Sequence, residues 1–166
     1  MLTLTQSPVA EPVTLEQVKA HLGVDHNQDD NLIQMGISAA REYVERYTGR
    51  ALVEATYLWT PGEYNFNCYL PRWPASVTRS YYVDDDGIEI DYDDWVIRRD
   101  GTVSYDRSDL SFELLTQPEW TTLPGQMTIA IFLLVESTYD ADPEQQETLR
   151  DAALKMLDLY KTDLGF

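Results

Sequence analysis

The chain has 166 residues, 43% of them hydrophobic, which is enough for one ordinary domain with a real core. Its 29 acidic residues outnumber 12 basic ones, and a net charge of −17 repels the phosphate backbone of nucleic acids. The single cysteine, Cys68, excludes an internal disulfide, and with the two histidines, His21 and His26, it argues against a Cys/His zinc site.

The N-terminal region predicts an extended arm followed by a short helix. Two prolines interrupt any helix within residues 1–13, which also lack the basic and apolar regions of a signal peptide. A helix is predicted at residues 14–23, because Thr14 and Gln17 have the spacing of a capping box. Gly23 is a suitable stop for this helix.

The clearest amphipathic pattern predicts a long helix at residues 29–49. Asp29 favours the positive end of the helix dipole and can cap the helix through its side chain. Gly49 is typical of the left-handed residue that ends a helix. Apolar residues recur at spacings of three and four and share one face of this helix: Leu32, Ile33, Ile37, Ala40, Tyr43, Val44 and Tyr47.

Residues 55–115 carry the pattern of a small antiparallel sheet. Pro61-Gly62 turns the chain between the first two strands, and the turns Asp86-Gly87 and Asp100-Gly101 each predict a hairpin. We therefore expect a sheet of about five or six strands, with Trp120 at its edge. The predicted strands lie at residues 55–60, 66–70, 77–83, 88–90, 95–97, 102–105 and 110–115.

Two further helices are predicted at residues 126–139 and 144–161, followed by a tail at 161–166. The run from Met127 to Val135 is apolar nearly all round, which predicts a central buried helix against which the 29–49 helix packs. The run is too short to span a bilayer. The predicted fold class is α+β and mainly α: a single domain over residues 1–166, with a bundle of about three to four helices and an inserted sheet.

The acidic stretch from Asp84 to Asp100 invites comparison with a calcium-binding loop. An EF-hand loop needs glycine at its sixth position and glutamate at its twelfth. Counting from Asp84, these positions hold Glu89 and Trp95, and no other register fits. The stretch is therefore interpreted as a solvated hairpin and loop.

The sequence gives no positive sign of an enzyme, a cofactor or a metal site. It contains no Gly-x-Ser-x-Gly elbow, no phosphate-cradling glycine loop and no dinucleotide fingerprint. No pair of carboxylates is singled out by spacing. One alternative stays open, an acidic sheet-based module that binds calcium or carbohydrate through Trp59, Trp73 and Trp95.

Several local patterns together resemble a known family. The segments Thr14–Val24 and Ala39–Leu52, the latter with Tyr-Thr-Gly-Arg, resemble the N-terminal signature of the tailed-phage head–tail connector (adaptor, head-completion) family. The corner Leu70–Pro74, Leu-Pro-Arg-Trp-Pro, is similar to the Leu-Pro-Arg-x-Pro corner of that family. The resemblance covers about residues 12–160, and its motifs are packing and turn signals.

The resemblance implies a non-enzymatic structural protein of the virion. Such a protein forms a homo-oligomeric ring at the head–tail junction, twelve-fold by analogy with the family, after assembly in the host cytoplasm. Its partners would be the portal protein and a stopper or tail-terminator protein. DNA would pass through the ring without specific binding, and no membrane is involved.

Particular residues are expected to make the contacts of this ring. In an acidic ring the scarce cations suit a neighbour's carboxylates, so contacts between subunits are expected at Arg41, Arg46 and Arg50. Arg41 and Arg46 are expected on the outer face of the 29–49 helix, together with Glu45. By analogy with the C-terminal segment of the family, docking to the portal is expected at Leu159, Tyr160, Leu164 and Phe166.

Overall fold

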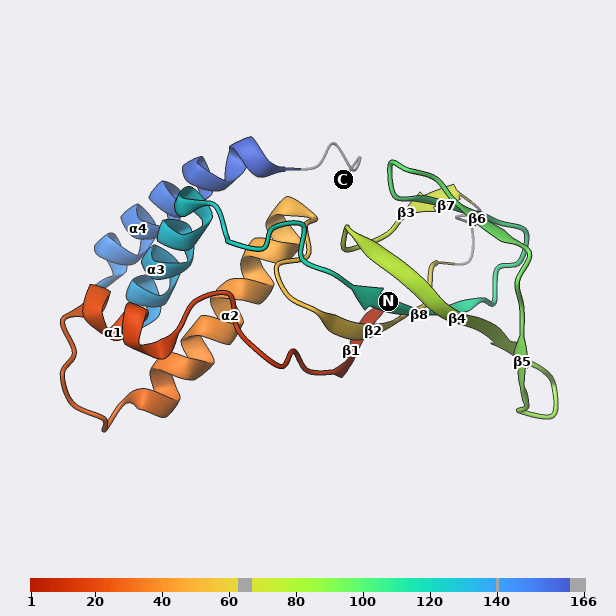
Figure 1. Ribbon diagram of the computed structural model, residues 1–166, viewed down its shortest axis with the longest axis horizontal. Coiled ribbons are helices and arrows are strands. Elements are labelled where there is room, and N and C mark those ends of the chain that lie inside the picture. The colour runs from red at the N-terminus through yellow and green to blue at the C-terminus, as the bar shows by residue number, and fades with distance from the viewer. Residues whose placement is uncertain (63–66, 140, 162–166) are drawn as a thin grey trace. The chain divides into compact units, whose positions relative to one another are not determined.

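The computed structural model describes residues 1–62, 67–139 and 141–161, which form two compact units. The sheet unit comprises residues 1–9 and 53–119, and the helical unit comprises residues 10–52 and those from 120 onward. The elements (Figure 1) are β1 (Leu2–Gln6), α1 (Leu15–Leu22), α2 (Asp30–Thr48), β2 (Ala55–Trp59), β3 (Asn67–Tyr69), β4 (Ala75–Val83), β5 (Glu89–Asp91), β6 (Trp95–Ile97), β7 (Thr102–Tyr105), β8 (Ser111–Thr116), α3 (Gly125–Tyr139), α4 (Pro143–Leu157) and the 3₁₀ turn η1 (Asp158–Tyr160).

The α+β class predicted from the sequence is confirmed, with helix and strand more evenly balanced than in a mainly helical bundle. The four predicted helices are present, each within a few residues of its expected bounds. The predicted β insertion corresponds to most of the sheet unit. The organisation of residues 1–166 as a single domain stays a prediction.

The short helix α1 begins and ends as its sequence predicts. The Thr14 hydroxyl accepts a hydrogen bond from the Gln17 amide at 3.2 Å, and the Gln17 side chain accepts one from the Thr14 amide at 2.8 Å. This reciprocal capping box satisfies two backbone donors that the first turn leaves free. Gly23 ends the helix with a φ of 71°, in the left-handed region that favours glycine.

The long helix α2 ends as predicted and begins differently. Gly49 adopts a φ of 71°, and its N–H donates to the Glu45 carbonyl at 2.9 Å. The prediction that the Asp29 side chain caps α2 is wrong, because Asp29 has a ψ of 7° and its side chain makes no hydrogen bond to the first turn. Its carboxylate instead accepts a hydrogen bond of 2.6 Å from the Tyr139 hydroxyl, which ties the start of α2 to the last turn of α3.

The core of the helical unit lies along α3, as the apolar run of that helix predicts. Gly36 lies where α2 and α3 approach closely, since a Cβ added there would lie 3.3 Å from the Val135 side chain. The predicted packing of α2 against α3 is therefore confirmed, and α4 covers another side of α3. The buried residues of these helices include Ile33, Ile37, Val44, Met127, Ile131, Val135, Ala153 and Leu157.

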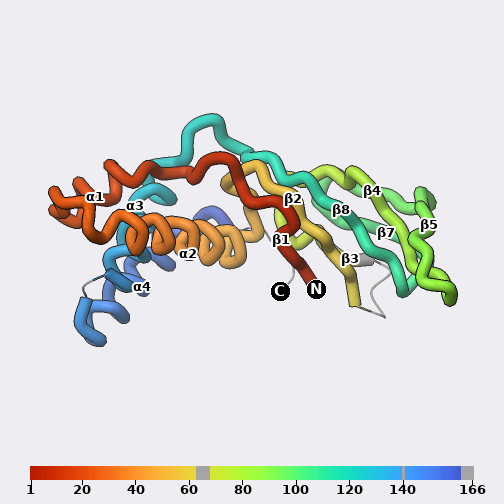
Figure 2. Tube along the Cα trace, turned by 90° about the horizontal axis from the view of Figure 1, so that it is seen from below, coloured from red at the N-terminus to blue at the C-terminus, as the bar shows by residue number. Residues whose placement is uncertain are grey.

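The sheet unit contains a five-stranded antiparallel sheet with the order β1-β2-β8-β4-β5. Figure 2 shows these strands side by side. The N-terminal residues, expected to form an extended arm, pair with β2 as the edge strand β1, with Leu2 opposite Trp59. Alternation of Leu2 and Leu4 with threonine fits a strand, but the short segment gave no sign of its partner.

A second sheet of three strands has the order β3-β7-β6. The predicted hairpin between β2 and β3 is wrong, because β2 pairs with β1 and β8 on its two sides and β3 pairs with β7. Residues 63–66, between β2 and β3, lie outside the described residues. The two Asp-Gly hairpins, β4 with β5 and β6 with β7, are confirmed.

Candidate docking surface

Arg50 organises a cluster at the C-terminal ends of α2 and α4 in the helical unit. Its Nε donates to the Tyr160 carbonyl at 2.7 Å, and its guanidinium lies 5.5 Å from the centre of the Trp120 ring. Trp120 and Tyr160 meet edge to face with ring centres 6.1 Å apart. Cation–π contacts of this kind hold the arginine against the aromatic ring.

A second group of rings and charges continues this surface along α2. The Tyr47 hydroxyl donates to the Asp158 carboxylate at 2.7 Å, and Lys161 lies 3.1 Å from that carboxylate and 4.0 Å from the centre of the Tyr47 ring. Tyr43 stacks on Tyr47 at 6.3 Å, with the Arg46 guanidinium 5.7 Å above Tyr43. We call the whole set the aromatic–cation surface: Tyr43, Arg46, Tyr47, Arg50, Trp120, Asp158, Tyr160 and Lys161.

The chemistry of this surface suits contact with another protein. Tyrosine, tryptophan and arginine are the side chains that most often dominate protein interfaces. Leu159, between Asp158 and Tyr160, is 76% exposed and adds an apolar side chain that the fold itself does not bury. Although the chain as a whole is acidic, cationic side chains and aromatic rings gather on this surface.

Most of the site residues predicted from the sequence fall on this surface. Arg46 and Arg50, expected between subunits, lie within one aromatic–cation surface with Tyr160, expected at the portal, and Leu159, also expected there, is the residue before Tyr160 in η1. The sequence did not single out Trp120, because a lone tryptophan after a loop has no spacing that ties it to Arg50. Two more predicted residues, Leu164 and Phe166, lie outside the described residues.

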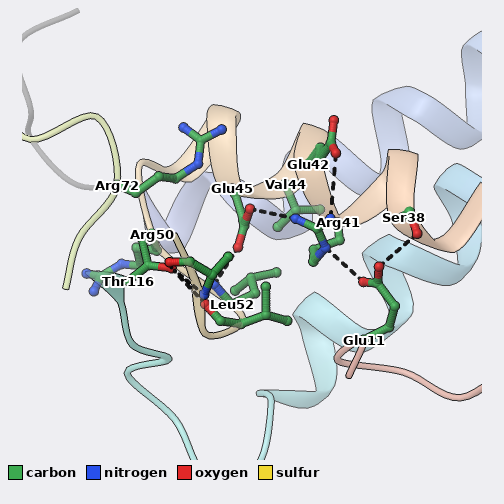
Figure 3. A network of polar contacts seen from close by, with 12 residues as sticks. Glu11, Ser38, Arg41, Glu42, Val44, Glu45, Arg50, Leu52, Arg72 and Thr116 are labelled. Atoms are coloured by element: carbon green, nitrogen blue, oxygen red, sulfur yellow. Dashed lines mark hydrogen bonds and ion pairs between the residues drawn. The ribbon is translucent and has the colours of Figure 1, made fainter. Parts of the chain in front are cut away.

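Arg41 does not lie on the outer face of α2, and that expectation is wrong for Glu45 as well. Arg41 is 2% exposed and Glu45 is 1% exposed. The guanidinium of Arg41 binds the Glu11 carboxylate at 2.8 Å and the Glu45 carboxylate at 3.0 Å (Figure 3). The periodicity of the sequence predicted that Arg41 lies on an exposed polar face. The segment before α1 that covers Arg41 has no periodic pattern, so the sequence did not predict this burial.

The network around Arg41 fixes two chain segments of the helical unit to α2. Glu11, just before α1, also accepts a hydrogen bond of 2.7 Å from the Ser38 hydroxyl. Glu45 accepts a hydrogen bond of 2.9 Å from the Leu52 amide, where the chain leaves the helix (Figure 3). A buried charge is tolerated when it is paired and hydrogen-bonded in this way. The role of Arg41 inside the subunit is thus structural.

The pH dependence of stability tests the bonds made by Asp158. The Tyr47 hydroxyl and the Lys161 ammonium hold the pKa of this carboxyl below its ordinary value of 3.8. The stabilisation is therefore present above about pH 4 and is lost as the pH falls through the lower pKa of the folded state. We expect Asp158→Asn to lower the melting temperature at pH 6, and we expect this deficit to shrink as the pH falls below about 4, as thermal unfolding will measure.

Asp151→Asn, on the exposed side of α4, is the matched control for this pH series. It removes one carboxylate from the same end of the chain without touching Tyr47 or Lys161. Its melting temperature should follow the wild type at every pH. A deficit of Asp158→Asn that does not shrink as the pH is lowered below 4 would show that the carboxylate charge is not what these bonds require.

The tryptophans of the sheet unit pack into its core rather than forming a sugar-binding face. Trp59 is 6% exposed and lies 5.4 Å from the Phe112 ring. Trp95 meets Phe112 edge to face at 6.2 Å, and Trp73 lies against Gly101, where a Cβ would come within 3.3 Å of its ring. A carbohydrate platform needs aromatic faces open to solvent, so these contacts weigh against the carbohydrate alternative.

The acidic stretch and the lone cysteine have structural contacts of their own. Arg79 binds Glu89 at 2.7 Å and Asp91 at 2.8 Å, so two of the carboxylates form ion pairs across β4 and β5. Burial raises the pKa of the Cys68 thiol, which disfavours the reactive thiolate. Within the described ranges, no group of three or more His, Cys, Asp or Glu side chains has the arrangement of a metal site.

His21 lies in a shallow pocket of the helical unit. Its Nε2 is 2.8 Å from the Glu136 carboxylate, and its ring packs 5.2 Å from Phe132. These contacts join the last turn of α1 to α3 and give His21 a structural place. The pocket is lined by His21, Leu22, Glu136, Tyr139, Ala141 and Gln145.

Across the described part of the chain, no helix has the length and apolar character needed to cross a membrane.

The half-buried rings and the cations of the aromatic–cation surface have the composition that is typical of contact with another protein. A family model described as the phage gp6-like head-tail connector protein matches residues 12–94, which is half of the chain. The chain therefore belongs to this family of structural connectors of the phage virion. No curated protein shows significant similarity to the chain.

Solved structures share the fold over nearly the whole length. A chain from the "Virion of native gene transfer agent (GTA) particle" has 19% identity and a TM-score of 0.68, with 98% of this chain and 95% of that chain covered. A chain from the "Neck of empty GTA particle computed with C6 symmetry" has 19% identity, a TM-score of 0.66 and the same coverage. A chain from the "Neck of native GTA particle computed with C12 symmetry" has 20% identity, a TM-score of 0.63 and again the same coverage.

Proposed function

We propose that this connector forms a homo-oligomeric ring between the capsid portal and the stopper or tail, and that the ring extends the DNA channel. Membership in the head–tail connector family is the observation that carries the proposal. The similar chains come from particle necks computed with six-fold and twelve-fold symmetry, which supports a ring of repeated copies. A ring with one interface repeated around an axis needs a head-to-tail contact between unlike surfaces.

The charge of the chain supports passage of DNA without specific binding. A net charge of −17 makes most of the surface repel phosphate at close range. Salt screens this repulsion over roughly 10 Å at about 0.1 M, so it acts at the wall itself. A wall of this kind lets a duplex slide, whereas cationic side chains facing the channel would hold it.

The aromatic–cation surface is the proposed docking site for the portal. It presents three tyrosines and a tryptophan beside cations, with the exposed Leu159 next to them, which is the composition of an interface centre with a polar rim. Leu159 and Tyr160 supply the central contacts, and Leu164 and Phe166 extend them in the proposal. Arg46 and Arg50 serve contacts between subunits or with the portal through the same surface, whereas buried Arg41 has no part in either.

Replacing Leu159 with aspartate tests this docking site. Leu159 is 76% exposed, so the substitution leaves the core intact and puts a charge where an apolar contact is proposed. We expect binding to the purified portal ring to weaken by more than about tenfold, because a charge without a partner at an interface centre costs at least about 1.4 kcal/mol. Surface-immobilised portal and a titration of the chain give the affinity.

The matched control is Leu32→Asp, at a leucine of α2 that is 55% exposed and lies outside the proposed docking site. Leu32→Asp changes the net charge by the same amount, and its affinity for the portal should equal that of the wild type. Equal affinity of Leu159→Asp and wild type would remove this surface from the portal contact. Absence of portal binding by the wild type itself would count against the proposed function as a whole.

A further inference from the structure

The turn between β4 and β5 is a rigid, exposed acidic tip. We call residues 84–87 the acidic turn. The Asp84 carboxylate accepts hydrogen bonds from the Asp86 amide at 3.0 Å and the Ile88 amide at 2.8 Å, and Gly87 adopts a φ of 80°. These bonds fix the backbone, so the side chains of Asp85 and Asp86 project into solvent. Neither carboxylate has an ion-pair partner among the described residues.

Exposed apolar side chains flank the acidic turn. Val83 is 53% exposed and Ile88 is 59% exposed, one on each side of the turn. Ile90, two residues beyond Ile88 on the same face of β5, is 37% exposed. β5 is also an edge strand, so its outer side faces no strand within the described sheet. Apolar side chains beside unpaired charges are typical of a surface that a partner covers.

The turn between β6 and β7 has the opposite charge. We call residues 98–101 the basic turn. Its backbone is held by the Arg98 amide bonded to the Thr102 carbonyl at 2.8 Å and by the Asp100 carboxylate, which accepts from the Thr102 amide at 2.9 Å. Arg98 and Arg99 are both exposed, and neither forms an ion pair with the residues that the structure describes. Val96, on the adjoining strand, is 60% exposed.

The pairing of these two turns across copies of the chain is the contact that the structure suggests. We propose that the basic turn of one copy binds the acidic turn of a second copy, with Arg98 and Arg99 paired to Asp85 and Asp86 and with Val96 beside Val83 and Ile88. Each turn offers two charges at the tip of a hairpin and an apolar flank, so the two are complementary in charge. This inference rests on the proposed ring and names one of its subunit contacts.

The positions of the two turns favour a second copy as the occupant. The acidic and basic turns lie at opposite ends of the sheet unit (Figure 1), so one copy cannot satisfy both by folding on itself. A contact between unlike surfaces at opposite ends repeats from copy to copy and closes into a ring when the rotation permits. Opposite charges also fix the order of the copies, because acidic-to-acidic or basic-to-basic docking is repulsive.

Charge reversal of either turn tests the contact. Arg98→Glu with Arg99→Glu makes both tips acidic, and Asp85→Lys with Asp86→Lys makes both tips basic. We expect association between copies on the portal ring to weaken by more than about 100-fold in each variant, because like charges placed together cost several kcal/mol. Asp93→Lys with Asp94→Lys changes the net charge as much as the acidic-turn variant, at exposed positions between β5 and β6, and should leave association unchanged.

Mixing the two reversed variants gives the decisive result. The variant with two acidic tips and the variant with two basic tips fail alone, yet together they can alternate around a ring with every contact restored. With the portal ring present, and with the wild type as the positive control, we expect analytical ultracentrifugation to detect rings in the equimolar mixture and not in either component. Recovery in the mixture also shows that both variants fold.

Three outcomes would overturn the inference. Rings formed by either variant alone would show that the turns do not pair, while the wild-type ring would still support the proposed function. Failure of the mixture, with both variants folded by circular dichroism, would exclude pairing of these two turns. Binding of wild-type chain to duplex DNA that is lost in Arg98→Glu with Arg99→Glu, with association between copies intact, would assign the basic turn to nucleic acid instead.

Discussion

Replacing Arg41 with alanine is expected to lower the free energy of unfolding by about 3–5 kcal/mol, because it removes a buried cation that binds two carboxylates. Glu45 is 1% exposed and cannot recover the lost contact by turning to water. Glu11 loses its ion pair as well, and the segment before α1 loses part of its attachment to α2. Urea unfolding followed by circular dichroism at 222 nm measures the change.

Two further variants separate the charge of Arg41 from its packing. Arg41→Met keeps most of the buried stem and should lose nearly as much stability as alanine, because the carboxylates still lose the guanidinium. Adding Glu45→Gln should recover at least about 1 kcal/mol, since glutamine carries no charge and can still accept the Leu52 amide. Arg46→Ala, on the exposed side of the same helix, should change stability by less than about 0.5 kcal/mol.

A loss below about 1 kcal/mol for Arg41→Ala would mean that the network contributes little beyond surface ion pairs. An equal loss for Arg46→Ala would show that the effect belongs to helix propensity or net charge and not to the buried site. Either result would contradict the structural role given to Arg41.

Phe112→Ala is expected to lower the free energy of unfolding by about 3–5 kcal/mol, because it opens a cavity at the centre of the sheet unit. Phe112 is 0% exposed on β8, and its ring touches Trp59, Tyr105 and Trp95 at centre distances of 5.4, 5.5 and 6.2 Å. Removing the ring therefore forfeits burial and several aromatic contacts at once. Guanidinium unfolding followed by tryptophan fluorescence reports the loss, since two tryptophans line the site.

Phe112→Leu is the matched control for the cavity. Leucine fills much of the space, so the loss should fall to about 1–2 kcal/mol. Similar losses for alanine and leucine would indicate that the core collapses around the site or that Phe112 is not central. A loss below about 1 kcal/mol for alanine would contradict the position of Phe112 in the core.

The helices were predictable from the sequence because their signals are local. The capping box of Thr14 and Gln17, the left-handed glycines at 23 and 49, and the apolar run of α3 each depend on neighbours within a few residues. The two Asp-Gly hairpins follow for the same reason, since a tight turn specifies which strand comes next. Asp29 shows where local signals fail. It has the position of a helix cap, but its carboxylate accepts a hydrogen bond from a tyrosine that is distant in the sequence.

Strand partners and buried ion pairs were not predictable, because they join segments far apart in the chain. β1 has the alternation of a strand but no turn that links it to β2, more than fifty residues later. Arg41 has the periodicity of an exposed residue, and Glu11, which covers it, belongs to an irregular segment. For the docking surface, resemblance to a family predicted Leu159 and Tyr160. The place of Trp120 in this surface is known only from its packing against Arg50 in the structure.

The measurement that tests the connector account most directly is a cryo-electron microscopy reconstruction of the neck of the particle that contains this chain. The account predicts a closed ring of copies between the portal and the tail or stopper, with the aromatic–cation surface against the portal and DNA passing along the axis. Density for this chain away from the head–tail junction, or a single copy beside the portal in place of a ring, would contradict it.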